Sequence, residues 1–214
     1  MKLLVTILFF SSIATPQVAD KANAGYKTKE GRESVAKTLA DPHRDDRQKP
    51  DELVAAMEIK PGMTVADIGT GVGYMLPFLS RAVGPGGKVF GEDIQTDFLD
   101  KAKAKVDSEK LSNVELLLGN ENDPKLPQAS VNVALVLDTY HHFDYPGKML
   151  ANIARALKPG GRLVIVDFYK KSRPDHVRLE RDEVAKEIES NGFHLLSKRD
   201  HTANSQYILT FEKQ

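Results

Sequence analysis

The chain has 214 residues, with 30 basic and 30 acidic side chains, and it contains neither cysteine nor tryptophan. The absence of cysteine excludes disulfides, cysteine-ligated metal sites and a cysteine nucleophile. A formal net charge of zero gives no general attraction to nucleic acid or acidic membranes. The hydrophobic fraction of 41% and a length above about 100–150 residues suit one globular domain with a substantial core.

The first 24 residues differ in composition from the rest of the chain. One lysine precedes an apolar run that ends near Ala14; this run is shorter than the ~20 residues that span a bilayer and is typical of a secretory signal. Ala22-Asn23-Ala24 is a small-x-small cleavage site before Gly25. The sequence therefore predicts a signal peptide over residues 1–24, export to the periplasm or the medium, and no stable membrane insertion after cleavage. The alternative is an N-terminal membrane anchor, or a buried N-terminal helix in a cytoplasmic protein.

Residues 25–50 are predicted to form a polar cap ahead of the main domain, residues 51–214. The end of this cap, residues 41–50, is rich in charge and allows two interpretations. Either His43, Arg44 or Arg47 folds over a binding site and pairs with a ligand, or the segment is solvated.

Three helix-type segments each end in a Pro-Gly turn that is followed by an apolar run. The helices are predicted over residues 52–59, 75–83 and 149–157, and the runs cover residues 64–68, 88–91 and 162–167. Proline disfavours helical geometry in the residue before it and glycine tolerates the left-handed turn, so each turn ends a helix. Residues 114–118 and 131–137 are further apolar runs, typical of parallel strands that are covered on both faces. The alternation predicts an α/β fold with a doubly wound sheet.

The pattern changes after residue 167. A polar loop with four basic residues spans 169–178, a charged helix follows with Val184 and Ile188 on one face, and strand-like segments cover 193–197 and 207–211. These two segments predict a C-terminal antiparallel hairpin, which completes a mostly parallel, seven-stranded sheet. The basic loop has little aromatic interleaving and indicates no nucleic-acid binding.

A glycine-rich turn, Asp67-Ile68-Gly69-Thr70-Gly71-Val72-Gly73-Tyr74, connects the first strand to the next helix. Glycines there let the backbone approach a ligand and leave helix amides free to bind it. A dinucleotide site requires G-x-G-x-x-G, whereas Gly73 comes one residue early and Tyr74 fills the sixth position. An acid two residues before the first glycine favours a ligand with a cationic end.

Three other polar elements follow strands at the edge where open α/β sheets bind ligands. Asp93 lies 24 residues beyond Gly69, close to the ~20-residue spacing at which a carboxylate binds the two hydroxyls of a ribose. Glu92 is the alternative, although its side chain is expected on the opposite face of the strand. Asn120 follows the third strand and is placed to meet a purine edge, and residues 138–143 follow the fourth.

From about Pro50 to Phe168, this order of motifs resembles the class I S-adenosylmethionine-dependent methyltransferases, as does the L-K-P-G-G stretch at residues 157–161. The resemblance implies a Rossmann-like fold with S-adenosyl-L-methionine as cofactor. In that family the glycine-rich turn wraps the methionine part, the acid after strand two holds the ribose, and the residue after strand three reads the adenine. The cofactor-binding residues so implied are Asp67, Gly69, Thr70, Gly71, Gly73, Tyr74, Asp93, Ile94, Asn120 and Asp138.

Two residues depart from the family pattern, which usually has aspartate at both positions. An amide at Asn120 can still accept from the adenine amino group and donate to a ring nitrogen, so it is expected to retune binding rather than abolish it. Asn132, which opens the fourth strand, is expected to have a structural role.

The candidate catalytic residues are Asp138, His141 and His142. One histidine would act as a general base that takes a proton as the acceptor attacks the methyl group. Alternatively the pair packs the turn, since in-line placement of acceptor and sulfonium needs no base. No group of His, Asp and Glu has metal-ligand spacing, so no metal site is predicted.

The resemblance implies methyl transfer to a small-molecule acceptor, because few residues remain for a large recognition domain. It specifies neither the acceptor nor the oligomeric state. A non-catalytic module of the same fold that binds S-adenosylmethionine or a nucleoside-like metabolite is the alternative, favoured by Asn120 and the export signal. The early Gly73 disfavours a nicotinamide oxidoreductase. Because S-adenosylmethionine is made in the cytosol, an exported protein would need the cofactor to reach it outside.

Overall fold

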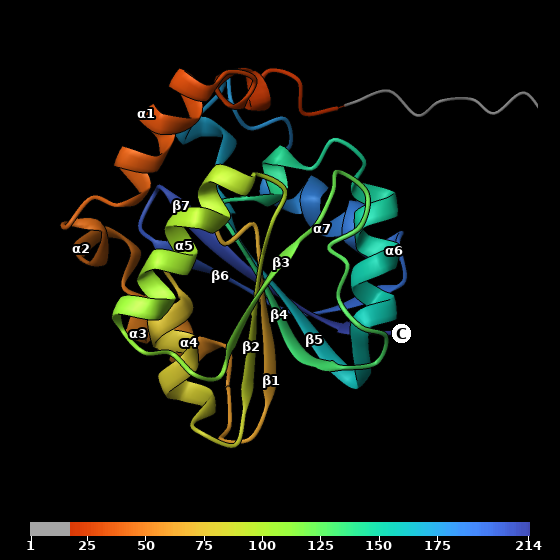
Figure 1. The fold of residues 1–214 in the computed structure, drawn as a ribbon. Helices are drawn as coiled ribbons and strands as arrows, with labels where there is room; N and C mark the ends of the chain where they lie inside the picture. Colours follow the sequence, from red (N-terminus) through yellow and green to blue (C-terminus); the bar gives the residue numbers. More distant parts are fainter. Residues whose placement is uncertain (1–17) are drawn as a thin grey trace, which may run out of the picture.

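The structure, a computed structural model, describes residues 18–214 and contains one seven-stranded sheet (Figure 1). The apolar run of the predicted signal peptide lies within residues 1–17, outside the described part, whereas residues 18–24 of that predicted peptide are described. The strands are β1 (Thr64–Ile68), β2 (Lys88–Asp93), β3 (Val114–Leu118), β4 (Val131–Leu137), β5 (Leu157–Phe168), β6 (Phe193–Thr202) and β7 (Gln206–Lys213). Their order is β3-β2-β1-β4-β5-β7-β6, with β1 to β5 parallel and β7 antiparallel to both β5 and β6. The predicted Rossmann-like, doubly wound sheet with a C-terminal hairpin is confirmed.

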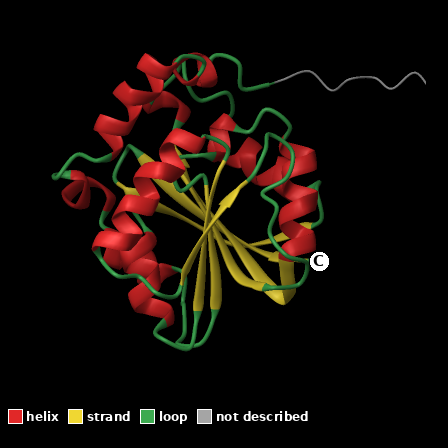
Figure 2. Ribbon diagram, in the orientation of Figure 1, coloured by secondary structure: helices red, strands yellow, loops and turns green. Residues whose placement is uncertain are grey.

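Helices cover both faces of this sheet (Figure 2). The helices are α1 (Lys29–Leu39), α2 (Arg44–Gln48), α3 (Pro50–Ala56), α4 (Leu76–Val83), α5 (Thr96–Ser108), α6 (Pro146–Ala156) and α7 (Arg181–Glu189), with short 3-10 turns η1 (Ala22–Tyr26), η2 (Tyr140–His142) and η3 (Lys170–Ser172). Helices α3, α4 and α5 lie on one side and α6 and α7 on the other (Figure 1). Within residues 18–214, no helix combines the length and the apolar character needed to cross a membrane.

Strand β4 shows why the central strands are almost wholly apolar. Its residues Val131, Ala134 and Val136 pack into the core beneath α6 and α7. The alternate residues Val133, Leu135 and Leu137 pack into the core beneath α3, α4 and α5. Because both faces of the strand are buried, no position except Asn132 carries a polar side chain. The Asn132 side chain accepts from the backbone N–H of Thr64 at 2.9 Å and from the Lys158 ammonium at 3.0 Å, which is a structural role.

Some boundaries differ from the prediction. β5 begins at Leu157 because this residue pairs with Val131 before a register shift, so the Pro-Gly turn lies inside the strand. Residues 198–202 continue β6 and Gln206 opens β7, so most of the segment predicted to connect the hairpin belongs to its strands. A short turn at residues 203–205 is enough to reverse an antiparallel pair.

The N-terminal strap, as we name residues 18–48, covers the carboxyl ends of the parallel strands. Ala36 of α1 packs with Val72 of the glycine-rich turn and Phe98 of α5, and the Arg32 guanidinium donates to the Asp97 carboxylate at 2.7 Å. The part of the chain predicted to be a polar cap is therefore helical and packs against the domain.

Candidate active site

A cavity of about 320 Å³ lies between the strap and the carboxyl ends of β1, β2 and β4. The glycine-rich turn contributes Gly69, Thr70 and Gly71 to its lining, and the end of β2 contributes residues 92–95. The segment after β4 contributes residues 137–139 and 142–144. The strap closes the cavity with Asp20, Asn23, Tyr26, Lys27, Leu39 and Arg44.

The glycine-rich turn has a backbone conformation that other residues rarely adopt. Gly69 and Gly71 have φ angles of +73° and +57°, and a Cβ atom at Gly69 would lie 2.3 Å from Cγ2 of Thr139. The hydroxyl of Thr70 donates to the Asp67 carboxylate at 2.6 Å, which ties the turn to the end of β1. Asp67 itself does not line the cavity; burial raises its pKa to about 6.

Two neighbouring acids at the end of β2 line the cavity. The Asp93 carboxylate accepts from the backbone amides of Gly71 and Gln95, both at 2.9 Å, and burial raises its pKa to about 6. Glu92 also lines the cavity, although the sequence predicted the opposite face for it. Its side chain occupies space left by Gly119, where a Cβ atom would lie 1.8 Å from Oε1 of Glu92. Among residues 18–214, that Oε1 atom is buried and has no hydrogen-bond partner, and burial raises the Glu92 pKa well above its ordinary value.

Other predicted cofactor residues divide between the cavity and the structure behind it. Ile94 and Thr70 line the cavity, whereas Gly73 and Tyr74 do not. Asn120 is also outside the lining: its side-chain oxygen accepts from the backbone amides of Asn122 and Asp123 at 2.9 and 3.0 Å. Glu121, which the sequence did not indicate, lines the cavity in its place.

The charge-rich segment at residues 41–50 combines the two interpretations that the sequence allowed. Arg44 folds inward: its guanidinium lies 4.0 Å from the centroid of the Tyr74 ring and 3.9 Å from the Asp138 carboxylate, and its side chain is 11% exposed. The side chains of His43 and Arg47 are 78% and 57% exposed. Burial lowers the pKa of Arg44, while Asp138 opposes that shift.

Asp138 follows β4 in a left-handed conformation, with a φ of +51°, and lines the cavity. Its carboxylate accepts from the side-chain amide of Gln206 and lies beside Arg44. Burial is the main reason that its pKa rises to about 6. Asp138 thus lies where a residue contacting either the cofactor or the acceptor would be.

The two adjacent histidines face different surroundings. His141 is buried behind the cavity, and its Nδ1 donates to Oδ1 of Asp167 at 2.6 Å. His142 lines the cavity; its Nδ1 donates to Oδ1 of Asn23 at 2.8 Å, and its Nε2 lies 3.4 Å from the hydroxyl of Tyr26. Burial lowers the pKa of His142 well below its usual value. His142 is therefore neutral at pH 7, with Nε2 on the cavity side as its unprotonated nitrogen.

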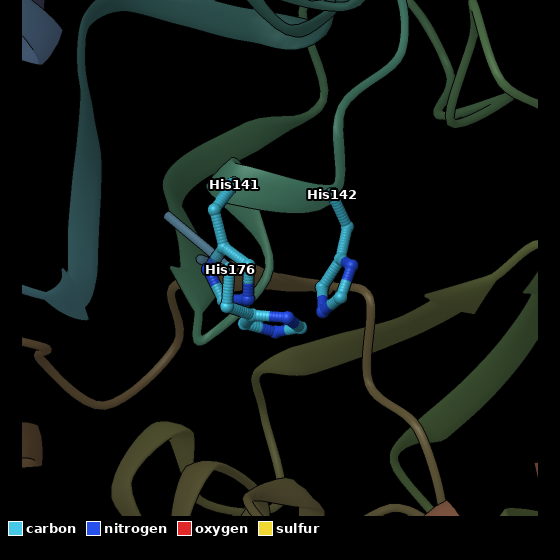
Figure 3. A group of neighbouring side chains, drawn as sticks. All are labelled: His141, His142 and His176. Atoms are coloured by element: carbon cyan, nitrogen blue, oxygen red, sulfur yellow. The ribbon is translucent and has the colours of Figure 1, made fainter. Parts of the chain in front are cut away.

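Several residues of the site were not identified from the sequence. Asn23 donates to the backbone oxygen of His142 and to the Asp144 carboxylate, both at 3.1 Å. Asp167 orients His141, and the His176 ring lies 4.7 Å from the His141 ring (Figure 3). The one available signal was that His141 follows β4 and Asp167 lies at the end of the neighbouring parallel strand β5, so their side chains meet at one edge of the sheet. Asn23 and His176 belong to segments for which the sequence predicts no partner.

A doubly wound seven-stranded sheet with this glycine-rich turn defines the class I methyltransferase fold. The structure of an S-adenosylmethionine-dependent methyltransferase from Aquifex aeolicus superposes with a TM-score of 0.80 and 32% identity, covering 85% of this chain and 98% of that one. The sequence pattern of the family described as "Methyltransferase domain" matches residues 59–211. The chain belongs to this methyltransferase family, and the resemblance found in the sequence is confirmed.

Two curated relatives show how far the similarity extends. The arsenite methyltransferase of Halobacterium salinarum is 32% identical over 57% of this chain and 32% of its own length. The ubiquinone/menaquinone biosynthesis C-methyltransferase of Vibrio vulnificus is 31% identical over 65% of this chain and 51% of its own length. The chain thus spans between about a third and a half of the curated relatives that it matches.

Proposed function

We propose that this protein transfers a methyl group from S-adenosylmethionine to a small-molecule acceptor. The observation that carries the proposal is the cavity itself, which Arg44, Asp93 and the glycine-rich turn line together. Relatives named as methyltransferases of arsenite and of quinone precursors, and the neighbour named for S-adenosylmethionine, support both the cofactor and a small acceptor.

The charged groups of the cavity suit the two ends of this cofactor. Arg44 is the buried cation that would pair with the cofactor's carboxylate, because a guanidinium binds carboxylates in a bidentate geometry. Asp93 and Glu92, which both line the cavity, would accept from the ribose hydroxyls. The buried carboxylates around the turn also favour a ligand with ammonium and sulfonium charges.

The acceptor would lie beside His142 and Phe143. The cavity volume of about 320 Å³ is at the small end of the range for small-molecule sites. The bound cofactor supplies a methyl group activated by its positive sulfur. His142, neutral and oriented by Asn23, is the group that would take a proton from the acceptor at Nε2. Tyr26 lies 3.4 Å from that nitrogen and, with the rest of the strap, would exclude water from the site.

Calorimetric titration with S-adenosylmethionine and S-adenosylhomocysteine, followed by transfer of a labelled methyl group to a panel of small acceptors, tests the proposal. We expect both ligands to bind and at least one acceptor to be methylated with His142-dependent kinetics. Binding of neither ligand would contradict the proposal. Binding without turnover across the panel would support the non-catalytic module instead.

A further inference from the structure

Three of the chain's six histidines gather beside the cavity. His141 and His142 come from η2, and His176 comes from the loop ahead of α7 (Figure 3). The centroids of their rings are 4.1, 4.7 and 5.2 Å apart. One ring nitrogen from each residue lies within 4.8 Å of the other two, so one ion could bind all three nitrogens if the rings moved closer together.

Hydrogen bonds hold two of these rings in the tautomer that a metal requires. Nδ1 of His141 is committed to the Asp167 carboxylate and Nδ1 of His142 to the Asn23 side chain. In each ring Nε2 therefore carries the free lone pair. A histidine that binds a metal almost always donates its other nitrogen to a carboxylate, a carbonyl or water in this way.

Asp167 is itself fixed in place. Its carboxylate also accepts from the backbone amides of His141 at 3.1 Å and Phe168 at 2.8 Å, and the residue is 1% exposed.

Two charged groups act on this cluster. Asp167 contacts His141, and the Arg173 guanidinium lies 3.9 Å from the centroid of the Phe168 ring. The negative charge of Asp167 compensates the positive charge of Arg173. The hydroxyl of Tyr26, 3.4 Å from Nε2 of His142, is the weakly held contact that an ion would replace.

We propose that His141, His142 and His176 form a binding site for one divalent transition-metal ion, of which Zn²⁺ is the best match. Three imidazoles with one open position are a common ligand set for zinc, whose bonds to histidine nitrogen of about 2.0–2.1 Å place tetrahedral ligands about 3.3 Å apart. The nitrogens must therefore approach by up to about 1.5 Å. We expect His176 to make most of that movement, because it is half-buried and follows an exposed stretch, residues 171–175.

The open position would face the cavity, because His142 lines the cavity and the other two rings lie behind it. An ion there would take the lone pair at Nε2 of His142, so this nitrogen would act as the base only in the metal-free protein, and the ion would bind an oxygen of the acceptor. The metal site does not depend on methyl transfer, which proceeds from a sulfonium without a metal.

Titration of the chelator-treated, full-length protein with Zn²⁺ and Co²⁺ tests the site. We expect one ion per chain and, with Co²⁺, visible absorption bands typical of nitrogen ligands. The His176→Ala variant should bind at least about 100-fold more weakly, and Asn23→Ala about 10–100-fold, the usual cost of losing an orienting partner.

His43→Ala is the matched control, because His43 is exposed on α2's N-terminal side and outside the cluster, and it should bind as the unaltered protein does. If the His176→Ala variant unfolds early in a thermal melt, the His176→Gln variant replaces it in the metal titration. Absence of stoichiometric binding by the unaltered protein would overturn the proposal, and so would His176 variants that bind the ion as tightly as the unaltered protein does. Binding of S-adenosylhomocysteine by the same variants is measured in parallel, so failure of the metal site is distinguishable from failure of the cofactor site.

Discussion

The two ends of the cavity are built in different ways. The end that we propose for the cofactor is formed mainly by two short segments, the turn after β1 and the acids at the end of β2, with Arg44 added by the strap; much of its binding capacity is backbone held in left-handed conformations. The acceptor end is formed by side chains from three distant segments: Asn23 of the strap, His142 of η2 and, behind it, His176. A local motif specifies the first end, whereas only the folded chain assembles the second. Changes at the two ends should therefore have different consequences.

The largest effect is expected from Gly69→Ala at the cofactor end. A side chain there would combine a φ of +73° with a contact of 2.3 Å to Thr139, so we expect a loss of about 2–4 kcal/mol in the free energy of unfolding together with loss of cofactor binding. Chemical denaturation measures the first and calorimetry the second. Gly62→Ala is the control: Gly62 has a φ of +85° with nothing within 4 Å of its Cβ position, and it should cost about 1–2 kcal/mol. Equal costs would show that the Thr139 contact is unimportant.

At the acceptor end, removing the strap's first residues should cost about 3 kcal/mol of stability. A chain that starts at Gly25, as the predicted cleavage site would produce, lacks the three hydrogen bonds of Asn23, each worth about 1 kcal/mol. It also lacks Ala19 and Ala22, which are buried.

The comparison chain starts at Val18 and retains these contacts. Denaturation curves of the two chains should differ in midpoint, with the shorter chain also losing turnover more than cofactor affinity. Coincident curves would show that residues 18–24 do not stabilise the protein. Sequencing the amino terminus of the protein isolated from cells then shows whether the contacts persist there.

Asp93→Ala should weaken cofactor binding at least about tenfold, equivalent to about 1.4 kcal/mol, because it removes the carboxylate that we propose as the acceptor for the ribose hydroxyls. Asn120→Ala should change affinity by less than about twofold, since the Asn120 side chain closes its own turn. Calorimetric titration of the two variants with the cofactor measures the contribution of each residue to affinity. A larger loss from Asn120→Ala would restore the adenine contact that the sequence predicted.

The smallest effect is the pH dependence of cofactor affinity. The pKa values of Asp67 and Asp93 are raised to about 6, so these groups favour the folded state at low pH and oppose it as pH rises through 6. A cationic ligand favours their ionised forms, and affinity should fall roughly fourfold per group between pH 7.5 and 5.5.

His142 stays neutral over most of this range, because burial holds its pKa well below the usual value. Calorimetry in two buffers of different ionisation enthalpy should show proton release on binding near pH 6. Asp93→Asn should reduce that release, and pH-independent affinity in the unaltered protein would contradict the assigned pKa shifts.

The parts predicted correctly from the sequence are those that local patterns determine. Residues 114–118 and 131–137 form strands with the predicted bounds, and in 131–137 this follows from a run of apolar residues that is buried on both faces of the sheet. The predicted start of β5 at residue 162 was wrong, because the strand begins where Leu157 pairs with Val131 and no local signal reveals that pairing.

The same distinction applies to the site. Gly69, Gly71 and Asp93 are adjacent to strands whose order is typical of the family, so their positions followed from the fold. Arg44 was one of three candidates, and its inward position depends on the Tyr74 ring beneath it and on Asp138. The histidine cluster was missed because His176 approaches from a loop, where neither periodicity nor spacing indicates a contact.

The central claim is that the cavity binds S-adenosylmethionine between the glycine-rich turn and the strap. A crystal structure of the protein with S-adenosylhomocysteine tests it most directly. The account predicts ribose hydroxyls at Asp93 and Glu92, the amino-acid carboxylate at Arg44, and the sulfur facing His142. A ligand bound elsewhere, or a cavity that remains empty at saturating ligand, would contradict it.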